Sequence, residues 1–140
     1  MTVSKDKFVD NLNEDLQLEF KSIVMYINQI ARLKGAEYQQ TIEELRGHLD
    51  QEANHAIIVA QQIDFLGGTP TATVPDIDLA GSSEKAFQAD LELEEEQLNR
   101  YRERVQQADE LGLPDVAESL APVLEETQHH VRDLRSVLAA

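Results

Sequence analysis

Four segments of the chain carry apolar residues at the spacing of an α-helix, and this pattern restricts the fold more than any other feature. Within each segment the apolar residues recur every three or four positions, as on one face of an amphipathic helix. No segment shows the strict alternation of a half-buried strand. The sequence therefore predicts an all-α fold with helices at about 5–34, 37–66, 84–111 and 115–139. Pro122 lies inside the last segment, where we expect a kink or a broken first turn.

The connections between these segments differ in length. Gly35 separates the first two segments and residues 112–114 separate the last two, and short turns that contain glycine join antiparallel helices. Residues 67–83 form a long connection rich in Gly, Pro, Ser and Thr. A helix of about thirty residues is ~45 Å long, and about sixteen extended residues reach ~50 Å. We therefore expect one domain, residues 1–140, folded as an antiparallel four-helix bundle with one long crossover between the second and third helices.

The chain is strongly acidic. It has 12 Lys and Arg residues against 27 Asp and Glu residues, for a formal net charge of −15. This balance argues against nucleic acid as a partner, because phosphate backbones are bound by clustered Lys and Arg, whereas an acidic field concentrates cations. Neither a membrane span nor a signal peptide is predicted, because long apolar runs are missing. The lack of cysteine excludes disulfides and thiolate zinc sites, and we expect a cytoplasmic protein.

The two predicted hairpins match each other under an offset of 75 residues. Nine apolar or aromatic positions keep their character: Leu12/Phe87, Leu16/Leu91, Ile23/Leu98, Tyr26/Tyr101, Ile30/Val105, Leu45/Leu120, Leu49/Leu124, Val59/Leu134 and Ile63/Leu138. Two amphipathic hairpins of similar length can match by chance. The matched tyrosines, together with matched polar residues, favour an internal duplication.

Polar residues interrupt the apolar stripes at positions related by the same offset. Adding 75 takes Glu19 to Glu94 and His55 to His130. Glu52 lies three residues before His55, so both side chains meet on one helical face. Counted from the turn between their helices, Glu19 and Glu52 lie within roughly 2 Å of the same height. Because a carboxylate on an apolar face is costly unless it is paired or binds a cation, we expect these residues to converge around a cation.

Carboxylates combined with imidazoles are typical of a site for iron or manganese. Calcium prefers oxygen ligands alone, and structural zinc favours thiolates. Two divalent ions ~3.5–4 Å apart need a bridging carboxylate. A Glu-x-x-His helix offers one bridging carboxylate and one terminal nitrogen, and partner helices offer terminal carboxylates. The pattern therefore predicts a site for a pair of metal ions.

Several stretches resemble the bacterioferritin branch of the ferritin-like superfamily over nearly the whole chain: Leu12–Glu14, Glu19, Tyr26, Glu52–His55, Phe65–Pro70 and Asp90–Glu94. The resemblance implies a ferritin-like bundle that binds two iron ions. It also implies that Glu19 and Glu94 are terminal ligands and that Glu52 is a bridging ligand. His55 and His130 would then be the imidazole ligands.

Position 127 departs from the family pattern. Thr127 stands where the family has its second bridging glutamate. A local Glu-x-x-His motif runs from Glu126 to His129, but it lies roughly 100° round the helix from the apolar stripe. We therefore prefer His130 as the ligand and keep Glu126 as an alternative ligand, should Pro122 alter the helical phase. Loss of one bridge would leave either a single-ion site or an ion pair bridged by water.

Two other departures concern haem and assembly. Ala53 stands where bacterioferritins place a haem-binding methionine between subunits, so we expect no haem. No short fifth helix follows the fourth segment. In the resembled family that helix surrounds the four-fold channel of large cages, so we expect a homo-oligomer that is a dimer or a small cage.

Two hypotheses for function follow. The first is oxidation of Fe(II) by oxygen or peroxide, serving iron storage or protection from oxidants. Tyr26, which matches a tyrosine close to the metals in the resembled family, is the candidate catalytic residue, although Tyr26 and Tyr101 could equally be core residues. The second is a non-catalytic or single-ion bundle that acts as a dimeric interaction module, which Thr127 favours. A rubrerythrin-like peroxidase is disfavoured because cysteine is lacking.

Other polar residues have structural interpretations. His48 is expected to be a surface histidine or one satisfied by a neighbour, not a third imidazole ligand. Arg100, Arg102 and Arg104 are expected to pair with glutamates one turn away on their own helix.

Overall fold

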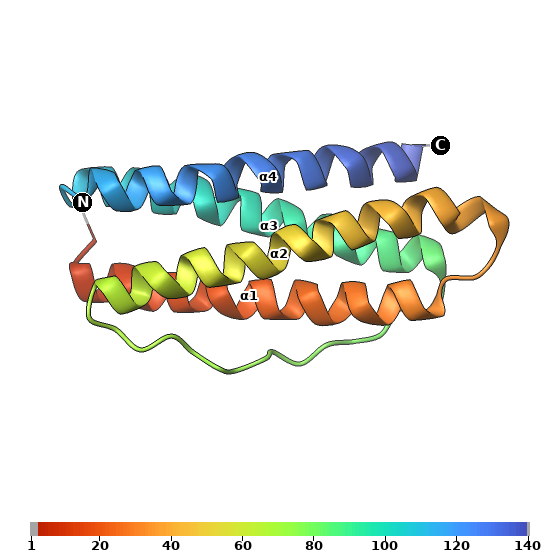
Figure 1. The fold of residues 1–140 in the computed structure, drawn as a ribbon, viewed down its shortest axis with the longest axis horizontal. Coiled ribbons are helices and arrows are strands. Elements are labelled where there is room, and N and C mark those ends of the chain that lie inside the picture. Colours follow the sequence, from red (N-terminus) through yellow and green to blue (C-terminus); the bar gives the residue numbers. More distant parts are fainter. Residues whose placement is uncertain (1–2, 140) are drawn as a thin grey trace.

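The computed structural model describes residues 3–139 as a bundle of four long helices (Figure 1). Their bounds are α1 Lys5–Arg32, α2 Gln39–Phe65, α3 Ser83–Glu110 and α4 Pro114–Ala139, with a short 3-10 helix, η1, at Ala36–Tyr38. These described residues include no strand. The predicted all-α four-helix bundle is confirmed.

Capping residues explain where several of these helices begin and end. The side chains of Ser4 and Ser82 each accept a hydrogen bond from the backbone N–H three residues further on, which caps α1 and α3. Gly67 and Gly112 follow the last turns of α2 and α3 at φ of 87° and 75°, a left-handed conformation that glycine adopts without strain. The helix limits thus follow from local sequence.

The long crossover is also confirmed. Figure 1 shows the segment between α2 and α3 running along the bundle beside α1. The side-chain amide of Asn13 on α1 holds its beginning: it donates to the carbonyl of Thr69 at 3.2 Å and accepts from the N–H of Thr71 at 2.8 Å. Gly68 allows the close approach, because a Cβ atom there would lie 2.6 Å from Cγ1 of Val9. This crossover makes α2 and α3 parallel.

The core consists of two apolar clusters at opposite ends of the bundle. α1 packs against α2 and α3, and α4 packs against α3 and α2. One cluster contains Phe8, Leu12, Leu16, Val59, Ile63, Val116 and Leu120, and the other contains Tyr26, Leu33, Leu45 and Phe87. The buried polar residues Glu19, Glu52, His55, Glu94 and His130, which interrupt the apolar stripes, lie between these clusters.

Pro122 does not break α4, contrary to the expected broken first turn. The helix runs without interruption from Pro114 to Ala139. Pro122 and Glu118 both lie on the exposed side of α4. Water can therefore bind the Glu118 carbonyl, which loses its helical donor because proline has no N–H.

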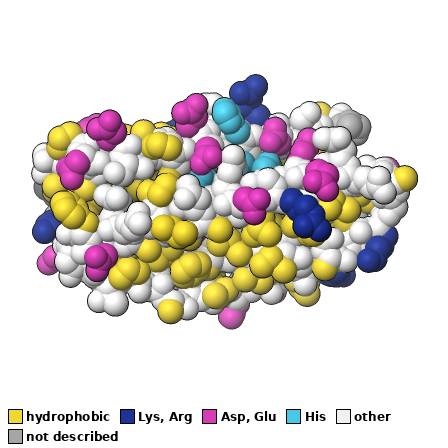
Figure 2. Space-filling view, in the orientation of Figure 1, with side chains coloured by type: hydrophobic (Ala, Val, Ile, Leu, Met, Phe, Trp, Pro, Cys, Tyr) yellow, Lys and Arg dark blue, Asp and Glu magenta, His cyan; other side chains and the backbone are white. Residues whose placement is uncertain are grey.

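Apolar side chains also gather on one face of the surface. Figure 2 shows hydrophobic side chains over α1 and α2. The large exposed hydrophobic residues include Val24, Ile27, Ile57, Phe65, Val74 and Leu79. Within residues 3–139, none of the helices is long and apolar enough to cross a membrane.

Candidate metal centre

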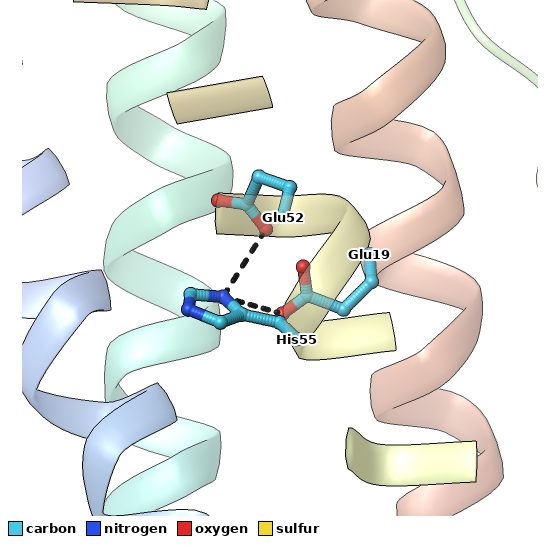
Figure 3. Close-up of side chains that lie close together, drawn as sticks. All are labelled: Glu19, Glu52 and His55. Carbon is cyan, nitrogen blue, oxygen red and sulfur yellow. Dashed lines mark ion pairs between the residues drawn. The ribbon is translucent and has the colours of Figure 1, made fainter. Parts of the chain in front are cut away.

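Five polar side chains from four helices meet between the two apolar clusters. α1 contributes Glu19, α2 contributes Glu52 and His55, α3 contributes Glu94, and α4 contributes His130. Each is at most 1% exposed. Figure 3 shows three of these side chains, from α1 and α2, directed toward one another. The structure thus brings together all five residues that the sequence analysis placed on the inner helical faces.

These residues form two groups that share Glu52. In each group, one nitrogen or oxygen atom per residue lies within 4.8 Å of the others. In the first, Nδ1 of His55 lies 3.7 Å from Oε1 of Glu19 and 3.7 Å from Oε2 of Glu52. In the second, Nδ1 of His130 lies 2.9 Å from Oε1 of Glu52 and 3.4 Å from Oε1 of Glu94. We name these the His55 half-site and the His130 half-site. Glu52 presents one oxygen to each, which is the placement of a bridging carboxylate.

Two buried tyrosines donate hydrogen bonds to Glu94 and Glu19 across the α1–α3 interface. The hydroxyl of Tyr26 on α1 donates to Oε1 of Glu94 on α3 at 2.8 Å. The hydroxyl of Tyr101 on α3 donates to Oε1 of Glu19 on α1 at 2.5 Å. Each hairpin therefore orients a carboxylate of the other hairpin. Tyr26, the candidate catalytic residue, lies beside the His130 half-site.

The buried carboxylates perturb one another's proton affinity. Burial raises the pKa of Glu52 well above its usual range, and the charges of Glu19 and Glu94 raise it further. Burial also acts to raise the pKa of Glu94, but hydrogen bonds, first with His130 and then with Glu52, bring it down to about 2. Three close carboxylates in a buried site need positive charge among them, from protons or from a cation.

Four oxygen and nitrogen atoms of the centre lack a hydrogen-bond partner within the described chain. They are Oε2 of Glu19, Oε2 of Glu52, Oε2 of Glu94 and Nδ1 of His55. Buried polar atoms are rarely left unpaired in native proteins, so these atoms mark a place for another group. Carboxylate oxygen and imidazole nitrogen together suit iron or manganese better than calcium or structural zinc. The residues present therefore fit a pair of divalent ions.

The outward nitrogens of the two histidines contact different residues. Nε2 of His55 lies 3.0 Å from Oε1 of Glu126, whose side chain is 30% exposed. Nε2 of His130 lies 2.6 Å from the amide oxygen Oε1 of Gln51. Both histidines therefore turn Nδ1 toward the carboxylates and Nε2 toward an oxygen at the edge of the bundle. Such an outer oxygen fixes the tautomer and orientation of a metal-binding imidazole.

The phase of α4 decides between the two motifs in its sequence. Thr127 and His130 are buried, each 1% exposed, whereas His129 is exposed. The hydroxyl of Thr127 donates to the carbonyl of Val123 at 2.7 Å, so it does not replace a bridging carboxylate. Glu126 reaches the centre only at the outer nitrogen of His55.

His48 is buried, so it is not a surface histidine, and only one of its two ring nitrogens is satisfied by a neighbour: Nδ1 has no hydrogen-bond partner among the described residues. It is 4% exposed, and its Nε2 lies 3.0 Å from Oδ2 of Asp133. Its ring stacks on that of His130, with centroids 4.0 Å apart. This contact helps to hold the His130 ring in place.

Comparison with known proteins identifies the family. The sequence matches the ferritin-like domain family over residues 9–140. The chain belongs to this family. A structure from Bacillus anthracis, described as ferritin-like, diiron-carboxylate proteins, is 27% identical, with a TM-score of 0.92 and 99% of each chain covered. No curated protein matches the chain.

Two bacterioferritins share the same fold. The one from Desulfovibrio desulfuricans is 24% identical with a TM-score of 0.86, over 96% of this chain and 80% of that one. A mycobacterial bacterioferritin is 24% identical with a TM-score of 0.87, over 99% of this chain and 86% of that one. The predicted resemblance to the ferritin-like superfamily is thus confirmed.

The expected pairing of the arginines within α3 is wrong for this ferritin-like chain. Arg104, 2% exposed, donates from Nε to Oδ2 of Asp15 on α1 at 2.8 Å. Arg100 also bonds Asp15, and it reaches Glu14 at 2.9 Å. Arg102 bonds only Asn99 among the hydrogen bonds of the described residues. Arginine at positions 100 and 104 reaches across the interface because a buried carboxylate on α1 attracts it more strongly than exposed glutamates on its own helix do.

Some residues around the centre were not singled out from the sequence. Gln51 and the buried Asp15 and Asp90 are the main ones. A signal for the aspartates existed, because the offset of 75 relates them. Gln51 gave no such signal, since its outer position follows only from the rotation of α2 against α4.

Proposed function

We propose that this ferritin-like protein binds two iron ions at the centre and oxidises Fe(II) with oxygen or peroxide, for iron storage or protection from oxidants. The observation that carries the proposal is the pair of half-sites sharing Glu52. Oxygen and nitrogen donors from four helices surround one buried point there, and several of them lack another partner.

Each of the two ions would be bound by a different pair of residues, with one residue shared. Glu19 and His55 would hold one ion, Glu94 and His130 the other, and Glu52 would contact both. When bound, the iron pair supplies the electrons that reduce the oxidant. The carboxylates stabilise the higher charge of Fe(III), and burial of the whole group excludes bulk water from it.

The tyrosines and outer residues keep this arrangement in place. Tyr26 and Tyr101 hold Glu94 and Glu19 by hydrogen bonds, so neither carboxylate has to be reoriented when an ion binds. Tyr26 is proposed to act beside the metals, through its contact with Glu94. Two similar proteins support this function, since one is described as a diiron-carboxylate protein and the other is a bacterioferritin with a diiron site.

Thr127 favours a second candidate function. Its hydroxyl is engaged by the backbone of α4, and Glu52 is then the one carboxylate that both half-sites share. A centre with a single bridge could hold one ion, or hold two without turnover. In that case the protein would be a metal-binding bundle and an interaction module.

Addition of Fe(II) without oxygen, followed by air, separates the two functions. The proposed function predicts about two bound irons per chain and a di-ferric absorption band after air is admitted. Glu52→Gln should abolish the band, whereas Glu96→Gln, which changes an exposed carboxylate of α3, should leave it unchanged. One iron per chain, or none, would overturn the proposal and support the second candidate.

We further propose that the protein is a homo-oligomer without haem. The exposed apolar residues on α1 and α2, among them Val24, Ile27 and Ile57, offer a surface that a second copy would cover. Ala53, where a haem-binding methionine stands in bacterioferritins, supports the lack of haem. Measurement of the mass in solution and of the visible spectrum of the purified protein would test both statements.

A further inference from the structure

The two half-sites differ in the residue that contacts the outer nitrogen of each histidine. Behind His55 stands the carboxylate of Glu126, and behind His130 stands the neutral amide of Gln51. We infer that Glu126 is a positioning residue that makes the His55 half-site bind the first divalent ion. The His130 half-site then binds the second ion more weakly. This inference rests on the proposed metal centre.

The physical reason lies in the tautomer and basicity of the imidazole. A histidine that binds an ion through Nδ1 carries its proton on Nε2 and donates it outward. Gln51 and Glu126 both present an oxygen to receive that proton. A carboxylate also pulls on the N–H and places a negative charge behind the ring, which makes Nδ1 a stronger ligand, whereas an amide oxygen only fixes the orientation.

Other charges near the centre do not reverse this difference. On the Glu19 side, Arg100 and Arg104 are matched by Asp15 and Glu14, to which they are bonded. The net charge of these four side chains is therefore zero, and the exposed Glu103, 3.7 Å from Nη1 of Arg104, adds no positive charge.

On the Glu94 side, the nearby acids act on other residues. Asp90 is hydrogen-bonded to Gln29, and Asp133 is bonded to His48 and is about half exposed. Neither makes a hydrogen bond to a ligand imidazole. Within residues 3–139, Glu126 is the one carboxylate outside the two ligand groups that is bonded to a ligand histidine.

Glu126 is also the alternative ligand predicted from the sequence, and a ligand and a positioning residue would behave differently in experiments. A positioning residue acts only through His55, so its effect disappears when His55 is removed. A ligand contacts the ion directly, so its effect persists without His55. The geometry favours the first role, because Oε1 of Glu126 lies at Nε2 and not at the inward Nδ1.

Calorimetric titration with Co(II), which does not react with oxygen under these conditions, tests the inference. We expect two binding constants in the wild-type protein. Glu126→Gln, which keeps the shape of a partly exposed side chain, should weaken the tighter constant by about tenfold or more and leave the other within about twofold. Gln51→Glu should strengthen the weaker constant by a similar factor. Glu125→Gln, at an exposed neighbouring position, serves as the control and should change neither.

Variants that lack one of the two histidines show through which half-site Glu126 acts. In a His130→Ala background, Glu126→Gln should still weaken the remaining ion by about tenfold. In a His55→Ala background it should have no effect. Thermal unfolding of each metal-free variant establishes that it is folded before titration.

The following results would contradict the inference. An effect of Glu126→Gln that persists without His55 would make Glu126 a ligand. Two ions whose affinities are insensitive to Glu126→Gln would overturn the inference and leave the proposed function standing. If the wild-type protein binds one ion, the second, weaker site does not exist and the inference is wrong. If it binds no ion, both the inference and the proposed function are wrong.

Discussion

The two ends of the α1–α3 interface each bury an aspartate, and the aspartates have different hydrogen-bond partners. At one end, Asp15 is bonded to the guanidinium groups of Arg104 and Arg100. At the other end, Asp90 accepts one hydrogen bond from the amide of Gln29 at 2.8 Å. The offset of 75 takes Asp15 to Asp90 and Gln29 to Arg104. The two halves therefore keep the buried acid and differ in its partner.

This difference separates the proton affinities of two equally buried acids, each 2% exposed. Burial raises the pKa of both. For Asp15, the charges of Arg104 and Arg100 oppose the rise. For Asp90, the hydrogen bond from Gln29 is the opposing influence, and the pKa reaches about 7. A buried carboxylate next to guanidinium groups is stabilised in its charged form, whereas one next to an amide retains a proton up to neutral pH.

The largest effect is expected from Arg104→Ala at the charged end. Removing the guanidinium leaves Asp15 with its charge buried and incompletely paired, and breaking such a pair costs about 3–5 kcal/mol of unfolding free energy. Urea unfolding of the metal-free protein at neutral pH measures the loss. Arg102→Ala, which removes an exposed arginine two residues away, should cost less than about 0.5 kcal/mol. Equal effects of the two variants would mean that the Asp15 pair is not important for stability.

A smaller and pH-dependent effect is expected from Asp90→Asn at the neutral end. The pKa of Asp90 is higher in the folded protein than in the unfolded chain, so its contribution to stability is present at low pH and is lost as the pH rises through about 7. Between pH 5 and 7 the wild-type protein should lose roughly 2 kcal/mol relative to the Asn variant. Urea unfolding with a chelator at several pH values measures this difference. A constant difference between the two proteins would contradict the assignment.

The tyrosines provide a case in which the two halves keep the same chemistry. Tyr26→Phe and Tyr101→Phe each remove a hydrogen bond to a buried carboxylate, so each should cost about 1.5 kcal/mol in the metal-free protein. The comparison predicts equal losses, because the offset of 75 relates the two residues. Chemical unfolding of both variants in parallel is the measurement, and Tyr38→Phe serves as the control outside the centre. Clearly unequal losses would show that the halves differ here too.

The smallest effect is expected midway along the same interface, at Gln97→Met. Gln97 is 1% exposed, and within residues 3–139 neither atom of its amide has a hydrogen-bond partner. An apolar side chain of similar length removes that unpaired amide, so unfolding free energy should rise by up to about 1 kcal/mol. Gln106→Met on the exposed side of α3 is the matched control. A marked loss of stability in Gln97→Met would indicate that the amide has an important partner.

Much of the fold and the central residues could be predicted because they follow from spacing. The offset of 75 placed Glu19 with Glu94 and His55 with His130, and burial shows all four on inner faces. The inward direction of His130 followed from the apolar stripe of α4. Their role as ligands remains a proposal, because the fold shows only that they meet.

The contacts around these residues could not be predicted from spacing. Arg104 was expected to bond a glutamate on its own helix, but it lies against Asp15 on α1. Glu126 was considered as a ligand, but it lies behind His55. In both cases the local helix is compatible with either contact, and a neighbouring helix decides which one forms.

The sequence by itself therefore determined which side of each helix is buried, how the hairpins are connected, and which polar residues enter the core. These properties depend on the 3.6-residue turn and on the length of the connections, both of which are local. Only the tertiary structure decided which atom meets which: Nε2 of His55 with Glu126, or Arg104 with Asp15. Such contacts depend on the rotation and axial shift of one helix against another, and the packing of all interface side chains together sets both.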